Sequence, residues 1–286
     1  MRTYYPRVDP SMKKKHSRQV LFAALAVATF ALFGAGRADA GEEPFPDTFG
    51  LRLGGYNVRS ASTILRLDSA NAPVGAYIDF AETLGGETTA QVIRLDGLYR
   101  FNKYHSLAFS WYDLKFTGSR VIDKDIVWGG QTYPLNTQVD SELKFNVYKV
   151  NYQYSLHHDE NVELGVLVGL HVMKIGAGLN ASGIGQSKTE AVTAPLPVFG
   201  FFARYNFTPR LTAYYNYQFF FINYEDSVRG GLQDFLLGVE YRLFRNLGLG
   251  LAYNRFGLDM KSKSDESTIY VNTSWNGAML YGSVYF

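Results

Sequence analysis

The sequence contains no cysteine and, beyond its first 40 residues, no apolar run long enough to span a membrane as a helix. Without cysteine, a secreted scaffold held together by disulfides is excluded. A membrane-spanning helix needs about 20 consecutive apolar residues, so any crossing by the rest of the chain must be made by β-strands. The two absences together exclude a disulfide-rich domain and a helical membrane protein.

An excess of charge of one sign is also missing once the first 40 residues are set aside. Those residues hold seven of the 28 Lys and Arg and two of the 26 Asp and Glu, which leaves 21 basic and 24 acidic residues, or a net charge of −3. A nucleic-acid partner therefore has no electrostatic support. No phosphate-binding loop, metal-ligand cluster or nucleophile elbow is found, so we expect no cofactor and no metal.

The N-terminus has the three parts of a secretory signal. Basic residues at 13–18 precede an apolar run of 14 residues at 20–33, and Ala38-Asp39-Ala40 offers a small-x-small cleavage site. The run is too short to span a bilayer, and no cysteine follows it to carry a lipid anchor. We predict a cleaved signal peptide at 1–40, with Met12 as an alternative start, and a single domain at 41–286.

The rest of the chain is rich in aromatics, with 21 Tyr and 21 Phe in the whole sequence, and alternates apolar and polar residues in segments separated by turns. Four short connections alternate with longer polar stretches. The four lie at 102–104, 157–161, 207–210 and 244–246; the longer stretches lie at 69–88, 118–138, 180–194, 225–230 and 261–266. Ten strands are predicted between them, at 48–68, 89–101, 105–117, 139–156, 162–179, 195–206, 211–224, 231–243, 247–260 and 268–286. Eight and twelve are alternatives, because residues 54–62 can split the first segment and residues 76–80 can add a strand.

The last segment, 278–286, has Leu280, Val284 and Phe286 at alternate positions. A chain that begins with a secretion signal and ends on an aromatic residue in a strand resembles the outer-membrane β-barrels of Gram-negative bacteria, including the barrel half of OmpA-type proteins. The resemblance implies an all-β, transmembrane, antiparallel up-and-down β-barrel of about ten strands in the outer membrane. It also implies that Phe286 is a barrel-assembly signal, and that the partners are outer-membrane lipid, lipopolysaccharide and the barrel-assembly machinery.

Side chains alternate across a strand, so parity assigns each residue to the lipid or to the lumen. In 162–179 the even positions from 164 to 172 are apolar and face out, which turns Glu163 and His171 inward. The same rule in other strands gives a lumen charge network made of Arg94, Asp96, Arg100, Glu163, His171, Arg204, Asp234, Glu240 and Arg242. Buried charges are costly unless paired, so we interpret the network as a salt-bridged plug, with a narrow ion or solute path as the alternative.

Two strands change phase. The apolar residues of 139–156 are odd up to Val147 and even from Tyr148, which predicts a β-bulge between them. Strand 105–117 shows the same slip after Trp111, and there the alternative is that the strand has already left the bilayer. Outside the strands, residues 118–138 are interpreted as a hairpin above the membrane and residues 180–194 as a mobile loop.

Little in the sequence favours catalysis. We expect His171 to bond Glu163 or a neighbouring carboxylate, and His105, His157 and His158 fall at predicted periplasmic turns. The predicted function is a non-enzymatic outer-membrane protein, either structural or a narrow channel with a mostly plugged lumen. The alternatives are a hydrolase acting at the extracellular rim on lipid A or peptides and a surface adhesion or binding protein. The oligomeric state stays open.

Overall fold

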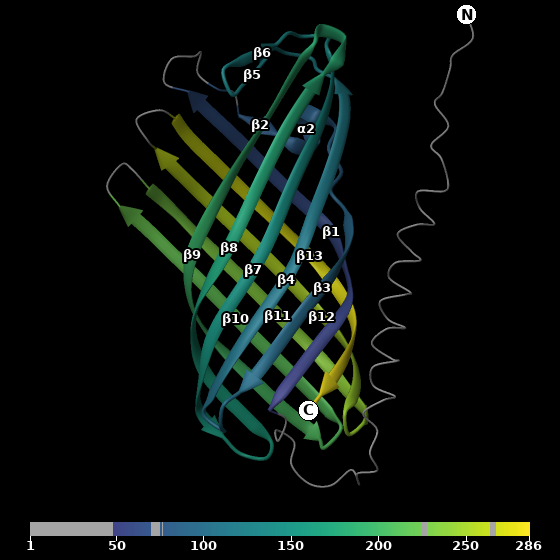
Figure 1. The fold of residues 1–286 in the computed structure, drawn as a ribbon, viewed down its shortest axis with the longest axis vertical. Coiled ribbons are helices and arrows are strands. Elements are labelled where there is room, and N and C mark those ends of the chain that lie inside the picture. Colours follow the sequence, from purple (N-terminus) through teal and green to yellow (C-terminus); the bar gives the residue numbers. More distant parts are fainter. Residues whose placement is uncertain (1–47, 70–74, 76, 225–227, 264–266) are drawn as a thin grey trace, which may run out of the picture.

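The computed structural model describes residues 48–69, 75, 77–224, 228–263 and 267–286, so the predicted signal peptide and Met12 lie outside the described residues. The chain forms ten long antiparallel strands and several short elements (Figure 1). The long strands are β1 (Phe49–Ser69), β3 (Ala90–Arg100), β4 (His105–Val121), β7 (Gln138–His158), β8 (Val162–Ala181), β9 (Gln186–Thr208), β10 (Leu211–Tyr224), β11 (Val228–Phe244), β12 (Leu247–Lys263) and β13 (Ser267–Tyr285).

The ten strands form a closed ring. Each pairs with its neighbour along the chain, and β13 pairs with β1 from Tyr285↔Gly50 to Ser267↔Ser69. The seam ends in a two-way backbone bond, in which Phe49 and Phe286 each donate to the other's carbonyl at 3.0 and 2.9 Å. The predicted ten-stranded up-and-down barrel is confirmed, because the ten long strands close on themselves through β13 and β1. The eight- and twelve-stranded alternatives do not agree with this ring.

One end of the barrel, which we call the turn end, holds the four short connections; the opposite end is the loop end (Figure 1). Side chains build these turns by accepting backbone hydrogen bonds. Asp159 Oδ1 accepts the N–H groups of Asn161 and Val162 at 2.8 and 2.7 Å, which hold the pKa of Asp159 below its usual value. Thr208 Oγ1 accepts from Leu211 at 3.0 Å in the turn before β10.

Three predictions about irregular segments are corrected. Strand β1 is not split; its register shifts once, between Val58 and Ser60. The described residues of 76–80 add no barrel strand, because they form only the two-residue β2 (Ile78–Asp79) and the start of the helix α2 (Phe80–Leu84). Residues 186–194, expected in a mobile loop, continue β9 in register with β8 as far as Gln186↔Ala181, and the tip is only the short 3₁₀ turn η1 (Ser182–Ile184).

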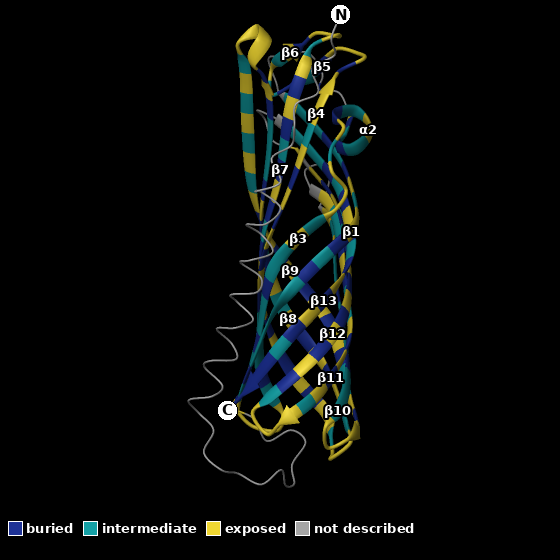
Figure 2. Ribbon diagram, turned by 90° about the vertical axis from the view of Figure 1, so that its right-hand side faces the viewer, coloured by how far each residue is buried: buried dark blue, intermediate teal, exposed yellow. Residues whose placement is uncertain are grey.

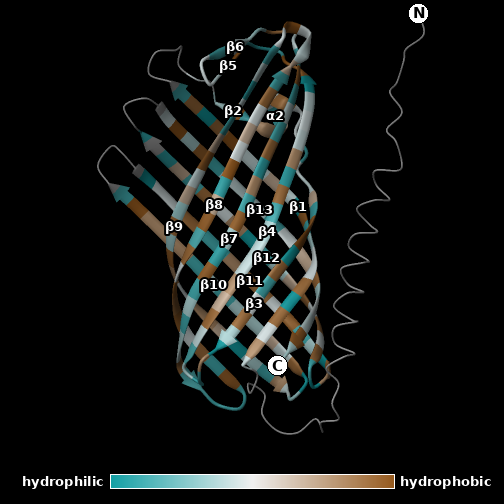
Figure 3. Ribbon diagram, in the orientation of Figure 1, coloured by the Kyte–Doolittle hydropathy of each residue, from teal (hydrophilic) through white to brown (hydrophobic). Residues whose placement is uncertain are grey.

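An apolar belt surrounds the turn-end half of the barrel. On β8 the outward side chains are 41–46% exposed, as parity predicted; they are Leu164, Val166, Val168 and Leu170. Figure 3 shows hydrophobic and hydrophilic residues alternating along these strands. From Leu164 to Val172 the belt occupies nine residues of β8, close to the about 9–11 that a tilted strand needs to cross a bilayer.

Towards the loop end the pattern inverts. On β4, Trp111 faces out, while Tyr112, Leu114 and Phe116 are at most 1% exposed in the interior. The β4–β7 register runs without a shift from His105↔Tyr154 to Val121↔Gln138. The apolar residues therefore change from the outer to the inner face without an extra residue, which is what a strand does when it passes from lipid into water.

The β-bulge predicted between Val147 and Tyr148 is therefore wrong. Both ladders of β7 are continuous there, and Val147 is fully buried inside the barrel while Tyr148 is 49% exposed outside. Beyond this level the outer face becomes polar, with Asn146 and Lys144 on the same outward face as Tyr148. The loop-end half thus has the polarity of a water-soluble β-protein and the turn-end half that of a membrane barrel.

The interior of the loop-end half is an apolar core, and buried positions alternate with exposed ones along its strands (Figure 2). Its large aromatic members include Phe116, Phe145, Tyr112, Phe256 and Trp275. The helix α2 contributes Phe80 and Leu84, both buried. The predicted hairpin in 118–138 exists as β5 (Ile126–Trp128) paired with β6 (Gln131–Tyr133), and it adds Ile126 and Tyr133 to the core.

Two neighbouring pairs of strands separate before they reach the loop end. Among the described residues the β3–β4 ladder stops at Arg94↔Tyr112, and the β9–β10 ladder stops at Phe199↔Phe219. Residues 85–88 close the first gap, since Glu87 donates to Thr117 on β4 and Thr88 accepts from Ala61 on β1, each at 2.9 Å. No helix in the described part of the chain is long and apolar enough to span a membrane, and α2 has only five residues.

Placing a charge in the belt should be costly. Val168→Arg, near the middle of the belt, is expected to lower the free energy of unfolding by about 2–4 kcal/mol, because arginine must enter the hydrocarbon. Asn146→Arg, outward on β7 above the belt, should change it by at most about 0.5 kcal/mol. Urea unfolding in lipid vesicles measures both, and equal losses would show that the belt is misplaced.

Candidate functional site

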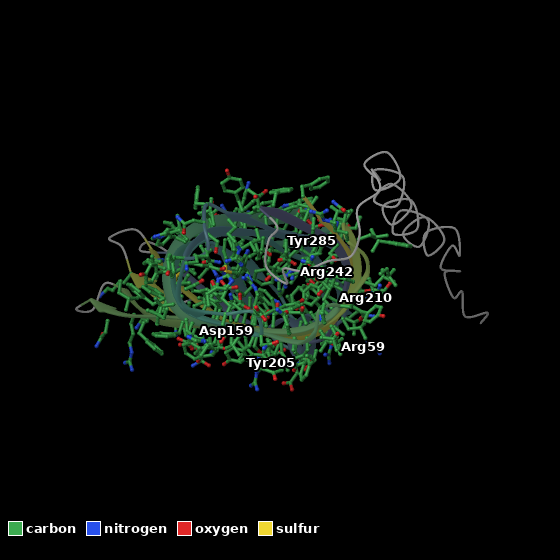
Figure 4. All side chains as sticks on the ribbon, turned by 90° about the horizontal axis from the view of Figure 1, so that it is seen from below. Arg59, Asp159, Tyr205, Arg210, Arg242 and Tyr285 are labelled. Carbon is green, nitrogen blue, oxygen red and sulfur yellow. The ribbon has the colours of Figure 1, made fainter. Side chains whose placement is uncertain are left out.

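Charged side chains fill the lumen of the turn-end half. All nine residues of the lumen charge network lie on inward positions of the barrel strands, and side chains crowd the ring when it is viewed from below (Figure 4). The structure brings eight of the nine into three clusters, and each cluster also recruits residues that the network did not include. His171 has a separate partner.

The first cluster surrounds Glu163 of β8, whose exposure is zero. Arg100 of β3 approaches it with two nitrogens, Nη1 to Oε1 at 2.9 Å and Nη2 to Oε2 at 3.0 Å. Arg204 of β9 adds Nη1 to Oε2 at 2.6 Å, and Ser155 Oγ donates to Oε1. Two guanidinium groups and a hydroxyl thus saturate one carboxylate, which is the condition under which a buried charge is tolerated.

The second cluster connects opposite walls of the lumen. Arg94 of β3 bonds Asp96 through Nε and Nη2, each at 3.0 Å, and its Nη1 donates to Asn254 Oδ1 of β12 at 3.1 Å. Asn254 Nδ2 donates to Asp234 Oδ1 at 2.7 Å, and Lys149 of β7 pairs with the other oxygen of Asp234. A continuous chain of polar contacts therefore crosses from β3 through β12 and β11 to β7.

The third cluster joins β1 to β11. Arg52 of β1 bonds Glu240 of β11 through Nε at 2.9 Å, and the Tyr285 hydroxyl also donates to Glu240. Arg52 lies over the Tyr214 ring at 4.4 Å from its centroid, and Arg242 lies over the Tyr285 ring at 4.2 Å. Such stacking keeps the arginine planes against the wall, where cation–π attraction adds to the ion pair. Figure 4 labels Arg242 and Tyr285 close together within the ring.

His171 does not contact Glu163, contrary to the expected bond. Its Nε2 lies 2.7 Å from Gln218 Oε1 of β10, and its side chain is fully buried. Glu163 pairs with His158 of β7 and Arg204 of β9, whereas His171, eight residues further along β8, pairs with Lys149 of β7. The distance between Glu163 and His171 along β8 is thus too large for the two side chains to meet.

The clusters border a small cavity. It measures about 100 Å³ and lies among Arg52, Arg94, Asp96, Lys149 and Arg204. A water occupies about 30 Å³ in the liquid, so the space suits a few waters. Within the described residues no group of three or more His, Cys, Asp or Glu is placed to hold a metal ion.

Several lumen residues that make these contacts are missing from the network predicted from the sequence. Arg52, Lys149, Gln218 and Asn254 all occupy inward positions. The signal for Lys149 was present, because it alternates with the outward Tyr148 and Val150. Arg52 alternates in the same way with Leu51 and Leu53. The neutral amides carry no such signal, because an inward Asn or Gln resembles any polar lumen residue until its partners are known.

Phe286, the predicted assembly signal, directly follows β13 and points outward. Its side chain is 59% exposed, and its ring lies 6.3 Å from that of Phe49. The side chain of Phe286 therefore points outward at the turn end, while its backbone closes the ring.

No protein-family model and no curated protein matches the sequence. Among solved structures, the fold is similar to that of the outer membrane protease OmpT of Escherichia coli, with a TM-score of 0.52 over 85% of this chain and 100% of that chain at 9% identity. Ail, the attachment invasion locus protein of Yersinia pestis, gives 0.34 over 82% and 97% at 14% identity. The toluene transporter TodX of Pseudomonas putida gives 0.29 over 88% and 94% at 10% identity.

The closed ring of ten strands, the outward apolar belt and the likeness to OmpT define the class of the fold. The chain has the fold of the Gram-negative outer-membrane β-barrels. At 9% identity the likeness extends to the fold alone.

Proposed function

We propose that this protein is a non-enzymatic outer-membrane protein with a closed lumen, which anchors a rigid extracellular half rather than conducting solutes. In this proposal the signal peptide directs it to the outer membrane, and the belt contacts lipid and lipopolysaccharide. Phe286 is the feature offered to the barrel-assembly machinery. The loop end is then extracellular and the turn end periplasmic.

The pairing of charges across the lumen carries this proposal. Lys149 on β7 reaches Asp234 on β11, and Arg100 on β3 reaches Glu163 on β8, so each pair ties strands on different sides of the ring. An ion passing through would have to break contacts whose members are at most 8% exposed. Above these pairs lies the apolar core, in which the ring centroids of Phe145 and Trp275 are 5.3 Å apart. This core presents a second obstacle to a hydrated ion.

A surface-binding role is the second candidate, and the inverted half favours it. Strands β7, β8 and β9 continue beyond the belt in unbroken ladders, with their own apolar interior and a polar exterior. That exterior carries both signs, as in the exposed pairs of Glu142 with Lys115 and Lys144. A rigid polar platform of this kind is suited to contact with a macromolecule outside the cell.

A hydrolase at the extracellular rim receives no such support. The four histidines after residue 40 lie at the turn end, where His105 begins β4 and His157 and His158 end β7, or inside the lumen, where His171 bonds Gln218. General acid–base chemistry by histidine needs the imidazole within reach of substrate, and these positions are remote from the loop end.

Single-channel recording in a planar bilayer tests the closed lumen. The refolded protein should show no discrete conductance steps, with insertion verified in the same preparation by flotation with vesicles and protection from protease. Reproducible steps whose ion preference moves towards cations on Arg204→Glu would overturn the proposal and establish a channel lined by the clusters.

A further inference from the structure

The barrel wall is open on one side of the loop-end half. Strand β9 pairs with β10 from Thr208 to Phe199, and from Val198 to Gln186 its described partners are all on β8. Pro197 and Pro195 follow directly on this free edge. Proline has no N–H to donate to a ladder, so both residues favour an edge strand here over continued pairing with β10. Unlike the gap between β3 and β4, this one is not bridged by a backbone segment among the described residues.

Behind the opening lies an apolar cavity of about 300 Å³. Its walls come from both sides of the gap and from the strands behind it: Ala194 and Leu196 of β9, Phe220 of β10, Leu258 and Met260 of β12, and Ile269 of β13. These residues belong to the apolar core or pack against it. The cavity is therefore the unfilled, outward-opening side of that core.

The mouth of the cavity is at the height of the membrane. Val172, the uppermost belt residue of β8, pairs with Pro195, which lies in the part of β9 that no longer pairs with β10. The gap therefore begins below the top of the belt. The outward side chains at its lower corner are Phe199 and Phe221, 56% and 69% exposed. The apolar surface thus continues from the lipid-facing belt, around the edges of β9 and β10, into the cavity.

We propose that this cavity binds the acyl chain of a membrane lipid, which enters sideways from the leaflet nearer the loop end while its head group stays outside. The neighbouring medium at that height is hydrocarbon, and the entrance carries apolar side chains. An apolar cavity of about 150 Å³ already takes up benzene, and ligand pockets begin near about 300 Å³, so the space fits one chain rather than a whole lipid. No residue of the charged clusters lines the cavity, and a hydrocarbon chain that moved on among them would strip them of polar contacts. The cavity thus binds an acyl chain and does not conduct it through the barrel.

Photolabelling tests the proposal on the full protein in vesicles. The probe is a phospholipid with a photoactivatable diazirine at the end of one acyl chain, and labelled peptides are mapped by mass spectrometry. We expect adducts on the inward residues Leu258 and Met260 in addition to those on the belt. Adducts confined to outward residues such as Phe199 and Phe221 would overturn it. Inward adducts that form only with a diazirine-bearing free fatty acid would overturn the membrane as the source.

A matched pair of variants separates the cavity from general lipid contact. Ala194→Phe fills the cavity and should reduce inward labelling about tenfold, equivalent to about 1.4 kcal/mol of binding free energy. Ala203→Phe, on the same strand but facing out, should leave it unchanged. Belt labelling, which should be equal in all three proteins, reports that each is inserted. Undiminished inward labelling of Ala194→Phe contradicts the site, and if that variant fails to insert, the adduct map of the unaltered protein remains the test.

Discussion

Replacing Glu163 by glutamine is expected to lower the free energy of unfolding by about 3–5 kcal/mol, because it removes the buried negative charge that the guanidinium groups of Arg100 and Arg204 share. Glutamine keeps the size of the side chain, so the loss reports charge rather than packing. The three groups are 0%, 8% and 13% exposed, and water cannot replace the missing carboxylate. Urea unfolding in vesicles, followed by far-ultraviolet circular dichroism, measures the change.

The chain supplies a matched control for this substitution. Glu142 also contacts two cations, Lys115 and Lys144, but the three side chains are 39–56% exposed. Exposed ion pairs contribute at most about 1 kcal/mol, so Glu142→Gln should have a small effect. Similar losses in the two variants would show that the lumen is hydrated and that its ion pairs do not close it.

Trp275→Ala should lower the free energy of unfolding by as much as Glu163→Gln, for a different reason. Trp275 is 1% exposed, stacks on Phe256 at 4.2 Å between ring centroids and lies 5.3 Å from Phe145. Truncation leaves a cavity in the apolar core of the loop-end half and is expected to cost about 3–5 kcal/mol. The same unfolding measurement applies.

Trp111→Ala is the comparison for that prediction. Trp111 is 36% exposed on the outer face of β4, where lipid or interfacial water fills the space that the ring vacates. Its truncation should therefore cost clearly less than that of Trp275. A larger loss at Trp111 would mean that the loop-end core contributes little and that the barrel is stabilised mainly at its lipid boundary.

The sequence predicts the turn-end half of this protein well, because the bilayer imposes one rule on every strand there. An outward residue must be apolar, so parity alone places Val168 outside and Glu163 inside, and Asn, Asp and Pro mark the short turns. The strand number follows from the same alternation.

The rule fails where the strands leave the membrane. Above Trp111 and Tyr148 the apolar residues belong to the interior, so a fixed assignment of apolar to outside produced a false bulge at Val147. Residues 186–194 belong to a segment that the sequence predicts as a loop, because 180–194 holds two Gly and mostly small polar residues. Their strand conformation comes from the ladder with β8, which a single sequence does not display.

The lumen partners show a second kind of limit. Parity predicts that Lys149 and Asp234 face inward. Which strands face each other depends on the strand order, the shear and the tilt of the barrel, and these place β7 opposite β11. His171 shows the consequence, since it bonds Gln218 on β10 rather than the carboxylate on its own strand. Pairing across a barrel is a property of its geometry, while facing inward is a property of the strand.

The abrupt change of face on β4 and β7 also fixes the hydrophobic thickness that this barrel accepts. A strand tilted by about 45° climbs about 2.3 Å per residue, so neighbouring residues on one face differ by about 5 Å in depth. One such step above the belt, the outward residues are already Asp113, Asn146 and Lys174. A bilayer thicker by that amount would bring hydrocarbon against them, and it would have to thin around the barrel instead. The protein is therefore matched to a narrow range of membrane thickness.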